Sequence, residues 1–169
     1  MIKKINIHFL TLFGIGNIKI ASGTFASFFT SALYLLLIIL NVNFLIPLVV
    51  FFLIIPYSII VINKNSKLFS EIDAKEIVID EYIGQSIPLL IGYYFYPEFQ
   101  NFIWEQDKWV LIKFIAAAFL AFRFFDILKP YPINLIDKIK NGFGVVMDDV
   151  LAGIYATIFL YLLFELLIK

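Results

Sequence analysis

The chain has 169 residues, of which 62% are hydrophobic, including 20 Phe, whereas ordinary soluble domains are about 45–50% apolar. This composition predicts an integral membrane protein. The 13 basic and 13 acidic residues balance and so indicate no nucleic-acid partner, while the absence of Cys excludes disulfides, Cys-ligated zinc and thiol-based phosphatase chemistry. A single histidine, His8, excludes any mechanism that needs two.

The first residues resemble a signal peptide, with two lysines ahead of an apolar stretch, but Asn6, His8 and Thr11 interrupt that stretch. We therefore expect a short interfacial or re-entrant helix at the N-terminus. The next 44 residues, 20–63, carry no charge. One helix of that length would measure about 66 Å, about twice the hydrocarbon core of a bilayer. A hairpin of two spanning helices, broken at residues 41–43, is the physical interpretation.

Five apolar segments predict an all-α integral membrane protein, a compact bundle of about five transmembrane or re-entrant helices. The segments are 25–40, 44–62, 82–96, 109–125 and 150–168. The third is only about 22 Å long as a helix and contains Gly, Gln, Ser and Pro. If all five cross from a cytoplasmic N-terminus, most lysines face the cytoplasm, in agreement with the positive-inside rule. No internal repeat or linker is apparent, so residues 1–169 are expected to form a single domain.

Three polar segments should emerge on that cytoplasmic face: residues 14–24, 71–81, and a loop over 126–149. Asp80-Glu81 and Asp148-Asp149 stand just before the predicted third and fifth spans, where capping of a helix N-terminus is the simple explanation. Two such pairs, with Asp73 and Asp126 nearby, favour a cation site instead. Oxygen ligands without nearby His or Cys indicate Mg²⁺ or Mn²⁺ rather than zinc.

Arg123, Asp126 and Lys129 are spaced by three residues and share one helical face if that helix continues to Pro130. Arg123 and Asp126 then form an ion pair. Lys129 is either an interfacial lysine or a phosphate contact. Thr24, after Ser22-Gly23, stands at an expected helix start, where backbone N–H groups can bind phosphate, although the residues alone favour a plain turn in this segment. The spacing of a nucleotide-binding loop is absent.

Four blocks of the sequence resemble the phosphatidylglycerophosphatase A family. They are GIGNIKIASGT at 14–24, IVIDEYIG at 77–84, FRFFDILKPYPI at 122–133 and GFGVVMDDVLAGIYA at 142–156. They occur in the order found in that family and extend over nearly the whole chain. Two departures are Ser22, where members of the family often have Pro, and Gly142-Phe143, where they often have Gly-Gly. Neither removes a proposed metal ligand.

The resemblance implies a Mg²⁺-dependent enzyme of the bacterial inner membrane. It would be multi-pass, with its site on the cytoplasmic side, and would convert its lipid partner phosphatidylglycerophosphate to phosphatidylglycerol and inorganic phosphate. The expected roles are catalysis by Asp80, Asp126, Lys129 and Asp149, phosphate binding by Thr24, Arg123 and Lys129, and metal binding by Asp80, Glu81, Asp126, Asp148 and Asp149. The resemblance implicates Asp73 and Arg123 less directly than the other residues.

Two other functions stay open from the sequence: a membrane transporter whose acidic residues bind a cation, and a structural membrane protein with capping acids. A transporter predicts ionisable residues near the middle of its spans, whereas most charges here lie at one edge. For the enzyme, the residues do not distinguish attack by water from an aspartyl-phosphate intermediate, and they indicate no oligomeric state.

Overall fold

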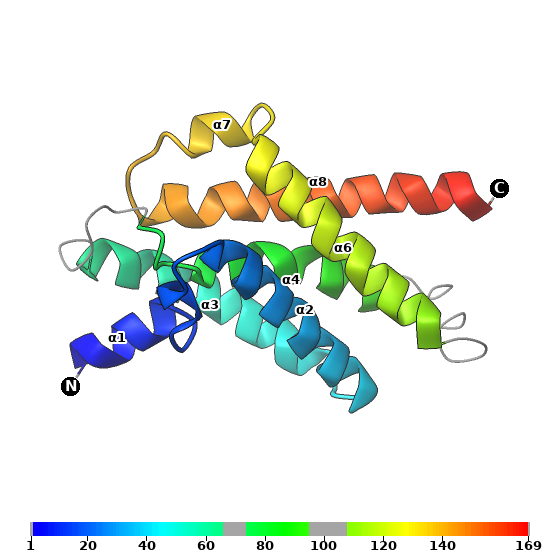
Figure 1. The fold of residues 1–169 in the computed structure, drawn as a ribbon, viewed down its shortest axis with the longest axis horizontal. Helices are drawn as coiled ribbons and strands as arrows, with labels where there is room; N and C mark the ends of the chain where they lie inside the picture. The colour runs from blue at the N-terminus through cyan, green and yellow to red at the C-terminus, as the bar shows by residue number, and fades with distance from the viewer. Residues whose placement is uncertain (1, 66–73, 95–107, 169) are drawn as a thin grey trace.

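The computed structural model describes residues 2–65, 74–94 and 108–168, and every regular element within these ranges is a helix. The all-α prediction is therefore confirmed. Figure 1 shows the arrangement of the elements. In chain order they are α1 (Ile2–Leu10), the 3-10 turn η1 (Ile15–Asn17), α2 (Ser22–Ile39), α3 (Leu45–Asn65), α4 (Ile79–Tyr94), α6 (Lys108–Leu128), α7 (Ile133–Ile136) and α8 (Gly142–Ile168).

Helices α2, α3 and α8 are each long and apolar enough to cross a membrane. Large apolar side chains such as Phe28, Phe52 and Leu162 are exposed on their outer faces, as lipid-facing residues are. The chain is therefore a membrane protein. The predicted number of about five spans stays a prediction, because α4 has 16 residues and α6 carries charges at both ends.

The break between α2 and α3 lies where the sequence predicts it. Asn41 has φ 52°, a left-handed conformation that Asn tolerates better than most residues. The Asn43 side chain accepts a hydrogen bond from the Leu45 backbone N–H at 2.9 Å, at the first residue of α3. Two asparagines thus end one helix and start the next.

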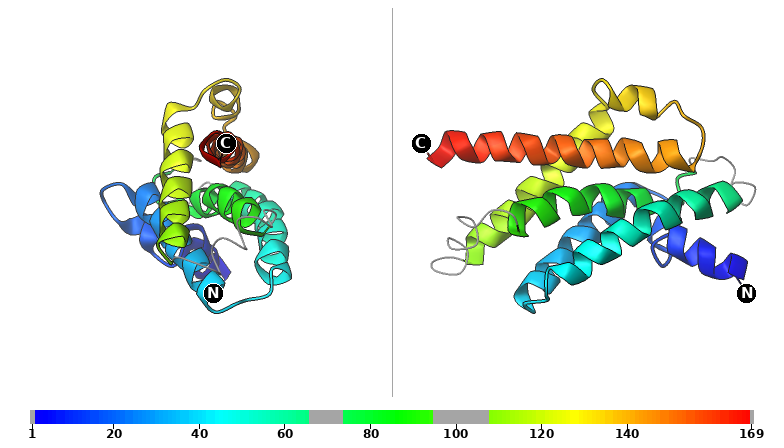
Figure 2. Two further views of the ribbon diagram at one scale, coloured as in Figure 1. Left: turned by 90° about the vertical axis from the view of Figure 1, so that its right-hand side faces the viewer. Right: turned by 180° about the vertical axis from the view of Figure 1, so that it is seen from behind.

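Helix α4 lies at the centre of the bundle and packs against α2, α3, α6 and α8 (Figures 1 and 2). Gln85, Ser86 and Leu89 are all fully buried in it. A helix enclosed by other helices needs neither the length nor the uniform apolarity of one that faces lipid. This position explains why the third predicted segment is short and polar.

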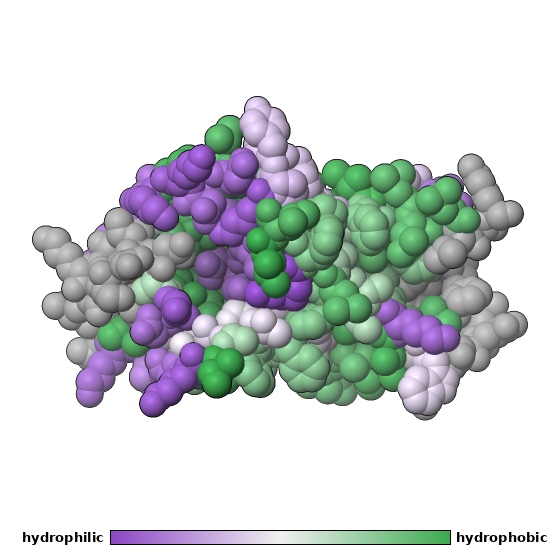
Figure 3. All heavy atoms as spheres, turned by 45° about the horizontal axis from the view of Figure 1, so that its top comes forward, coloured by the Kyte–Doolittle hydropathy of each residue, from purple (hydrophilic) through white to green (hydrophobic). Residues whose placement is uncertain are grey.

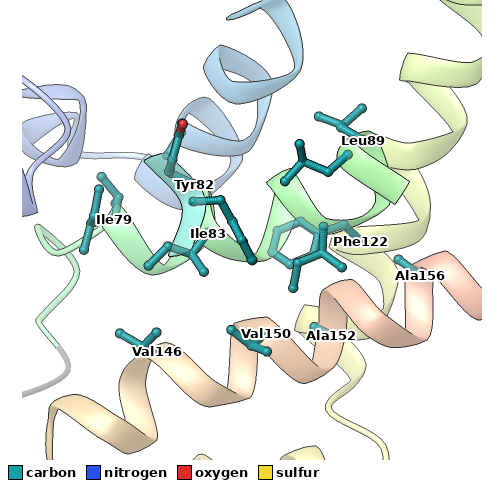
Figure 4. Close-up of a cluster of buried hydrophobic side chains, with 14 of the residues drawn as sticks. Ile79, Tyr82, Ile83, Leu89, Phe122, Val146, Val150, Ala152 and Ala156 are labelled. Atoms are coloured by element: carbon teal, nitrogen blue, oxygen red, sulfur yellow. The ribbon is translucent and has the colours of Figure 1, made fainter. Parts of the chain in front are cut away.

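Helices α4 and α8 approach closely because small residues face each other. A side chain at Gly153 of α8 would overlap the backbone carbonyl of Gly84 in α4, and Ala152 and Ala156 of α8 are fully buried, with Phe122 of α6 nearby (Figure 4). A side chain at Gly84 would overlap both the Phe122 ring and the backbone carbonyl of Asp149. Close contact at this point brings Asp149 beside the start of α4.

The prediction of a loop over residues 126–149 is wrong at both ends. Helix α6 continues to Leu128, α7 follows, and α8 begins at Gly142, so Asp148 and Asp149 lie inside α8 instead of before it. The early start has an identifiable cause. The Asn141 side chain accepts a hydrogen bond from Gly144 N–H at 3.0 Å, and that of Asn63 accepts one from Gly142 N–H at 2.7 Å.

The starts of α2, α4 and α8 and the end of α6 lie toward the same end of the bundle (Figures 1 and 2). Figure 3 shows hydrophilic side chains gathered over one half of the face in view and hydrophobic ones over the other. The bundle is therefore polarised along its length, as expected of a membrane protein with its site at one end.

Candidate functional site

A cavity of about 540 Å³ lies among the starts of α2 and α4, the end of α6 and the first turns of α8. Its wall includes parts of all three predicted polar segments. The eight predicted site residues all line it: Thr24, Asp80, Glu81, Arg123, Asp126, Lys129, Asp148 and Asp149. The structure therefore brings the predicted set together, while the role of each member stays a prediction.

One group in this wall, the Arg123 cluster, consists of Arg123, Glu81, Asp126 and Ser27. Arg123 Nη1 lies 2.5 Å from Glu81 Oε2 and 2.9 Å from Asp126 Oδ2. Ser27 Oγ donates a further hydrogen bond to Glu81 Oε2 at 2.9 Å. The side chains of Arg123, Glu81 and Asp126 are only 16%, 13% and 12% exposed, so these charges depend on one another for compensation.

The first residues of α2 pack directly against the Arg123 cluster. A side chain at Gly23 would overlap the Glu81 carboxylate and lie 3.5 Å from Arg123 Nη1, so a larger residue there would displace the pair. Ser22 Oγ donates a hydrogen bond to the Lys75 backbone carbonyl at 2.8 Å, which Pro at this position could not make. Thr24 follows in the first turn of α2, as predicted.

A second group, the Lys129 cluster, consists of Lys129, Asp137 and Asp148. The condition for a common face of Arg123, Asp126 and Lys129 is not met, because α6 ends at Leu128 and Lys129 has φ 43°. This conformation directs Lys129 Nζ to Asp148 Oδ2, at 2.7 Å, and to Asp137 Oδ1. Lys129 is therefore held by two carboxylates, one from the end of α7 and one from α8.

Burial disfavours the charged form of Lys129, but the hydrogen bonds to Asp137 and Asp148 outweigh that effect and raise its pKa above the ordinary value. The same bond from Lys129 lowers the pKa of Asp137. Lys129 and Asp137 therefore both stay ionised over the physiological pH range.

Asp149 lies deepest, with 4% of its surface exposed. Its Oδ2 atom is buried and has no hydrogen-bond partner. Asp148 and Asp149 are neighbours on a helix and so face about 100° apart. Accordingly Asp148 binds Lys129, whereas Asp149 is within electrostatic range of Glu81, Asp126 and Arg123. Asp148 thus belongs to the Lys129 cluster, whereas Asp149 lies near the Arg123 cluster.

Sequence reasoning missed two members of these clusters, Ser27 and Asp137. Ser27 belongs to a set of small or polar residues, with Gly23, Thr30 and Ser31, that recurs every three to four positions in an otherwise apolar helix. That period marks an inward-facing polar stripe. Asp137 had no comparable signal, because only the turn after Lys129 brings it back. The weaker candidate Asp73 lies outside the described residues.

The cavity supplies oxygen ligands suited to Mg²⁺ and no nitrogen or sulfur ligand. A buried carboxylate oxygen without a partner, Asp149 Oδ2, is the kind of atom that a cation satisfies. As the side chains stand, however, no three acidic or histidine side chains in the described ranges are arranged to hold one ion. The physical reason is that Arg123 and Lys129 already bind Glu81, Asp126 and Asp148. The donor chemistry of the cavity fits Mg²⁺, while three of its five carboxylates are paired with Arg123 or Lys129 in this arrangement.

Residues 8–164 match the family model described as phosphatidylglycerophosphatase A. This chain belongs to that family. A relative from Haemophilus influenzae named phosphatidylglycerophosphatase A is 40% identical over 159 residues, which cover 92% of this chain and 86% of the relative. The resemblance seen in the sequence is thus confirmed, and by family membership the chain is an enzyme, a phosphatase.

Two further relatives match over shorter stretches. A candidate phosphatidylinositol-3-phosphatase of Bacteroides thetaiotaomicron is 38% identical over 57% of this chain and 52% of its own length. A phosphatidylglycerophosphatase A of Escherichia coli is 30% identical over 59% of this chain and 49% of its own length. No solved structure matches this chain at a significant level.

Proposed function

We propose that this chain is a Mg²⁺-dependent phosphatase that removes the terminal phosphate of phosphatidylglycerophosphate, giving phosphatidylglycerol and inorganic phosphate. The observation that carries the proposal is the single cavity in which five carboxylates surround Arg123 and Lys129, at the polar end of an apolar bundle. Membership of the phosphatidylglycerophosphatase A family supports this substrate. The lipid's acyl chains stay in the bilayer while its head group enters the cavity.

In this proposal Arg123 is the first contact of the terminal phosphate. Its Nη1 already binds two carboxylate oxygens, so its guanidinium is oriented for oxygen acceptors. A phosphate oxygen that replaces one of them gains a charge-assisted hydrogen bond without reorganising the arginine. Thr24 and the first backbone N–H groups of α2 line the same cavity and supply further donors. Lys129, held by Asp137 and Asp148, contributes a second positive charge to the same cavity.

Asp149 is the group proposed to take the proton from the attacking water. It is the most deeply buried of the cavity carboxylates, and one of its oxygens has no hydrogen-bond partner. The water oxygen bonds to phosphorus as the bond to the glycerol oxygen breaks. That oxygen leaves as the alcohol after taking a proton from solvent, to which Asp149 returns the proton it has taken. Rapid-quench labelling with ³²P-labelled substrate tests the alternative, in which Asp149 attacks phosphorus itself and retains the label.

Asp80, Glu81, Asp126, Asp148 and Asp149 are the residues proposed to hold Mg²⁺. When bound, the ion neutralises phosphate charge and polarises a water molecule. It would also offset the repulsion that Asp149 meets from Glu81, Asp126, Asp80 and Asp148. An anionic substrate that competes for Arg123 would leave Glu81 and Asp126 available as ligands of the ion.

The test is release of inorganic phosphate from phosphatidylglycerophosphate by the purified protein in neutral detergent. We expect release with Mg²⁺, loss of release after chelation by EDTA, and recovery when excess Mg²⁺ is added. Absence of release at any Mg²⁺ concentration refutes the proposed reaction. Release that EDTA leaves unchanged refutes the metal requirement alone. Phosphatidylinositol 3-phosphate, offered in parallel, shows whether the activity named for the Bacteroides relative is shared.

The variant Asp149→Asn tests the site. Because it removes a buried carboxylate oxygen that has no other partner, we expect kcat to fall by about 100-fold or more. The matched control is Glu165→Gln, an exposed carboxylate on the same helix outside the cavity, which should retain wild-type kcat. If Asp149→Asn is folded, inserted in the membrane and fully active, Asp149 is not catalytic and its role is structural.

We further propose a bacterial inner-membrane location with the cavity on the cytoplasmic side. The absence of Cys makes this testable without background labelling. A single cysteine at Lys138, which is exposed between α7 and α8, should react with a membrane-impermeant maleimide only after the cells are opened. Labelling of intact spheroplasts at this position contradicts the orientation.

A further inference from the structure

We infer that Lys19 and Lys75 form a second anion subsite at the rim of the cavity, which binds the phosphodiester of the lipid head group while the terminal phosphate occupies the carboxylate-lined floor. The inference rests on the proposed function, because it assigns a place to the substrate's second phosphate. It makes these two lysines determinants of substrate specificity rather than catalytic residues.

The first argument is the distribution of charge within the cavity. Arg123 and Lys129 each bind two carboxylates, so neither cation is surplus. The other basic residues of the cavity wall are Lys19 and Lys75, both exposed, and neither forms an ion pair within the described ranges. Within the described part of the chain, they are therefore the cations of the cavity wall that can accept an anion without first losing a partner.

The second argument is that the segments carrying the two lysines are held together by hydrogen bonds and close backbone packing. Val78 N–H donates to the Leu10 carbonyl at 3.0 Å, and Ser22 Oγ donates to the Lys75 carbonyl at 2.8 Å. A side chain at Gly16 would overlap the Glu76 backbone, so η1 and the segment before α4 are in direct contact. Lys19 and Lys75 are 56 positions apart in the sequence, but they lie on two segments that contact each other at the rim of the cavity.

The third argument is the chemistry of the substrate. Phosphatidylglycerophosphate carries a phosphodiester of one negative charge and a terminal monoester of about 1.5 to 2 negative charges at pH 7, by analogy with other phosphate monoesters. A floor with five carboxylates repels a second phosphate. Among the described basic residues of the cavity wall, Lys19 and Lys75 are the ones outside an ion pair, so we expect the diester to be stabilised beside them. A lipid with a monoester but no diester, such as phosphatidate, gains nothing from this rim.

Exposed lysines at a membrane surface also attract anionic lipids in general. The experiment separates that effect from a diester subsite. Steady-state kinetics are measured in neutral detergent micelles for wild type, for Lys19→Ala/Lys75→Ala, and for the charge-keeping Lys19→Arg/Lys75→Arg. The matched control is Lys64→Ala/Lys138→Ala, which removes the same charge from exposed positions outside the cavity. Phosphatidate serves as the competing ligand that lacks the diester.

For Lys19→Ala/Lys75→Ala we expect KM for phosphatidylglycerophosphate to rise about tenfold, as for loss of a charged hydrogen bond, with kcat within about twofold of wild type. The inhibition constant of phosphatidate should stay unchanged, the arginine variant should restore KM, and the control should match wild type. An unchanged KM, or an equal loss of affinity for both lipids, overturns the subsite. Absence of turnover by wild type refutes the proposed function instead, so the two failures are distinguishable.

Discussion

The Arg123 cluster and the Lys129 cluster are built from the same chemistry, one cation between two carboxylates, in different surroundings. The first joins α4 to α6 and is nearly enclosed, with side-chain exposures of 12–16%. The second joins α6, α7 and α8, and the side chains of Lys129 and Asp137 are 29% and 33% exposed. Exposure decides how much each charge depends on its partners, because water can replace a lost partner only where it has access.

This difference in exposure indicates that the two clusters have different roles. Asp149 is within electrostatic range of Arg123, Glu81 and Asp126, so the enclosed cluster lies beside the proposed base. The exposed cluster closes the turn between α6 and α8 and orients Asp148. The Arg123 cluster should therefore control both stability and turnover, and the Lys129 cluster chiefly the shape of the cavity wall.

The largest effect is expected from Arg123→Ala. It leaves Glu81 and Asp126 buried without their cation, which costs about 3–5 kcal/mol of unfolding free energy, and it removes the proposed phosphate contact. We expect a large drop in Tm by thermal unfolding in detergent and no measurable phosphate release. Arg123→Lys keeps the charge but not the guanidinium fork, so it should recover Tm more than kcat. Equal recovery of both contradicts a direct phosphate contact.

A smaller effect is expected from Lys129→Ala. Asp148, 7% exposed, loses its cation, while the more exposed Asp137 regains water, so the cost should be about 1–3 kcal/mol. Tm should fall less than in Arg123→Ala, and kcat should fall while some activity remains. If Lys129→Ala destabilises the protein as much as Arg123→Ala does, exposure is not what separates the two clusters.

The smallest effect is expected from Asp137→Asn, at less than about 1 kcal/mol, because its carboxylate is one-third exposed and Lys129 keeps Asp148. The pKa of Asp137 is lowered in the fold, so its contribution is present above the ordinary value of 3.8 and is lost as pH falls below it. The Tm difference between variant and wild type should therefore be constant near neutral pH and shrink in acid. A difference that grows in acid would show that the assigned sign is wrong.

The sequence correctly predicted which residues line the cavity, but it predicted less accurately which of them form ion pairs with each other. All eight predicted site residues line one cavity because apolar helices must align along a common axis, which brings their polar ends together. Pairing depends on local backbone geometry. The left-handed conformation of Lys129 turns its side chain away from the face of α6 that carries Arg123. The hydrogen bonds to Asn141 and Asn63 start α8 at Gly142, so that Asp148 and Asp149 lie inside this helix.

By itself, the sequence determined the membrane class, the helical fold, the family and the identity of the charged residues, because hydropathy, charge and motif are properties of the residues alone. Only the tertiary structure decided that α4 is enclosed by other helices, that Ser27 and Asp137 complete the two clusters, and that Asp148 and Asp149 serve different cations. These features depend on which helices contact each other, and such contacts are set by the packing of small residues and by turns of a few residues.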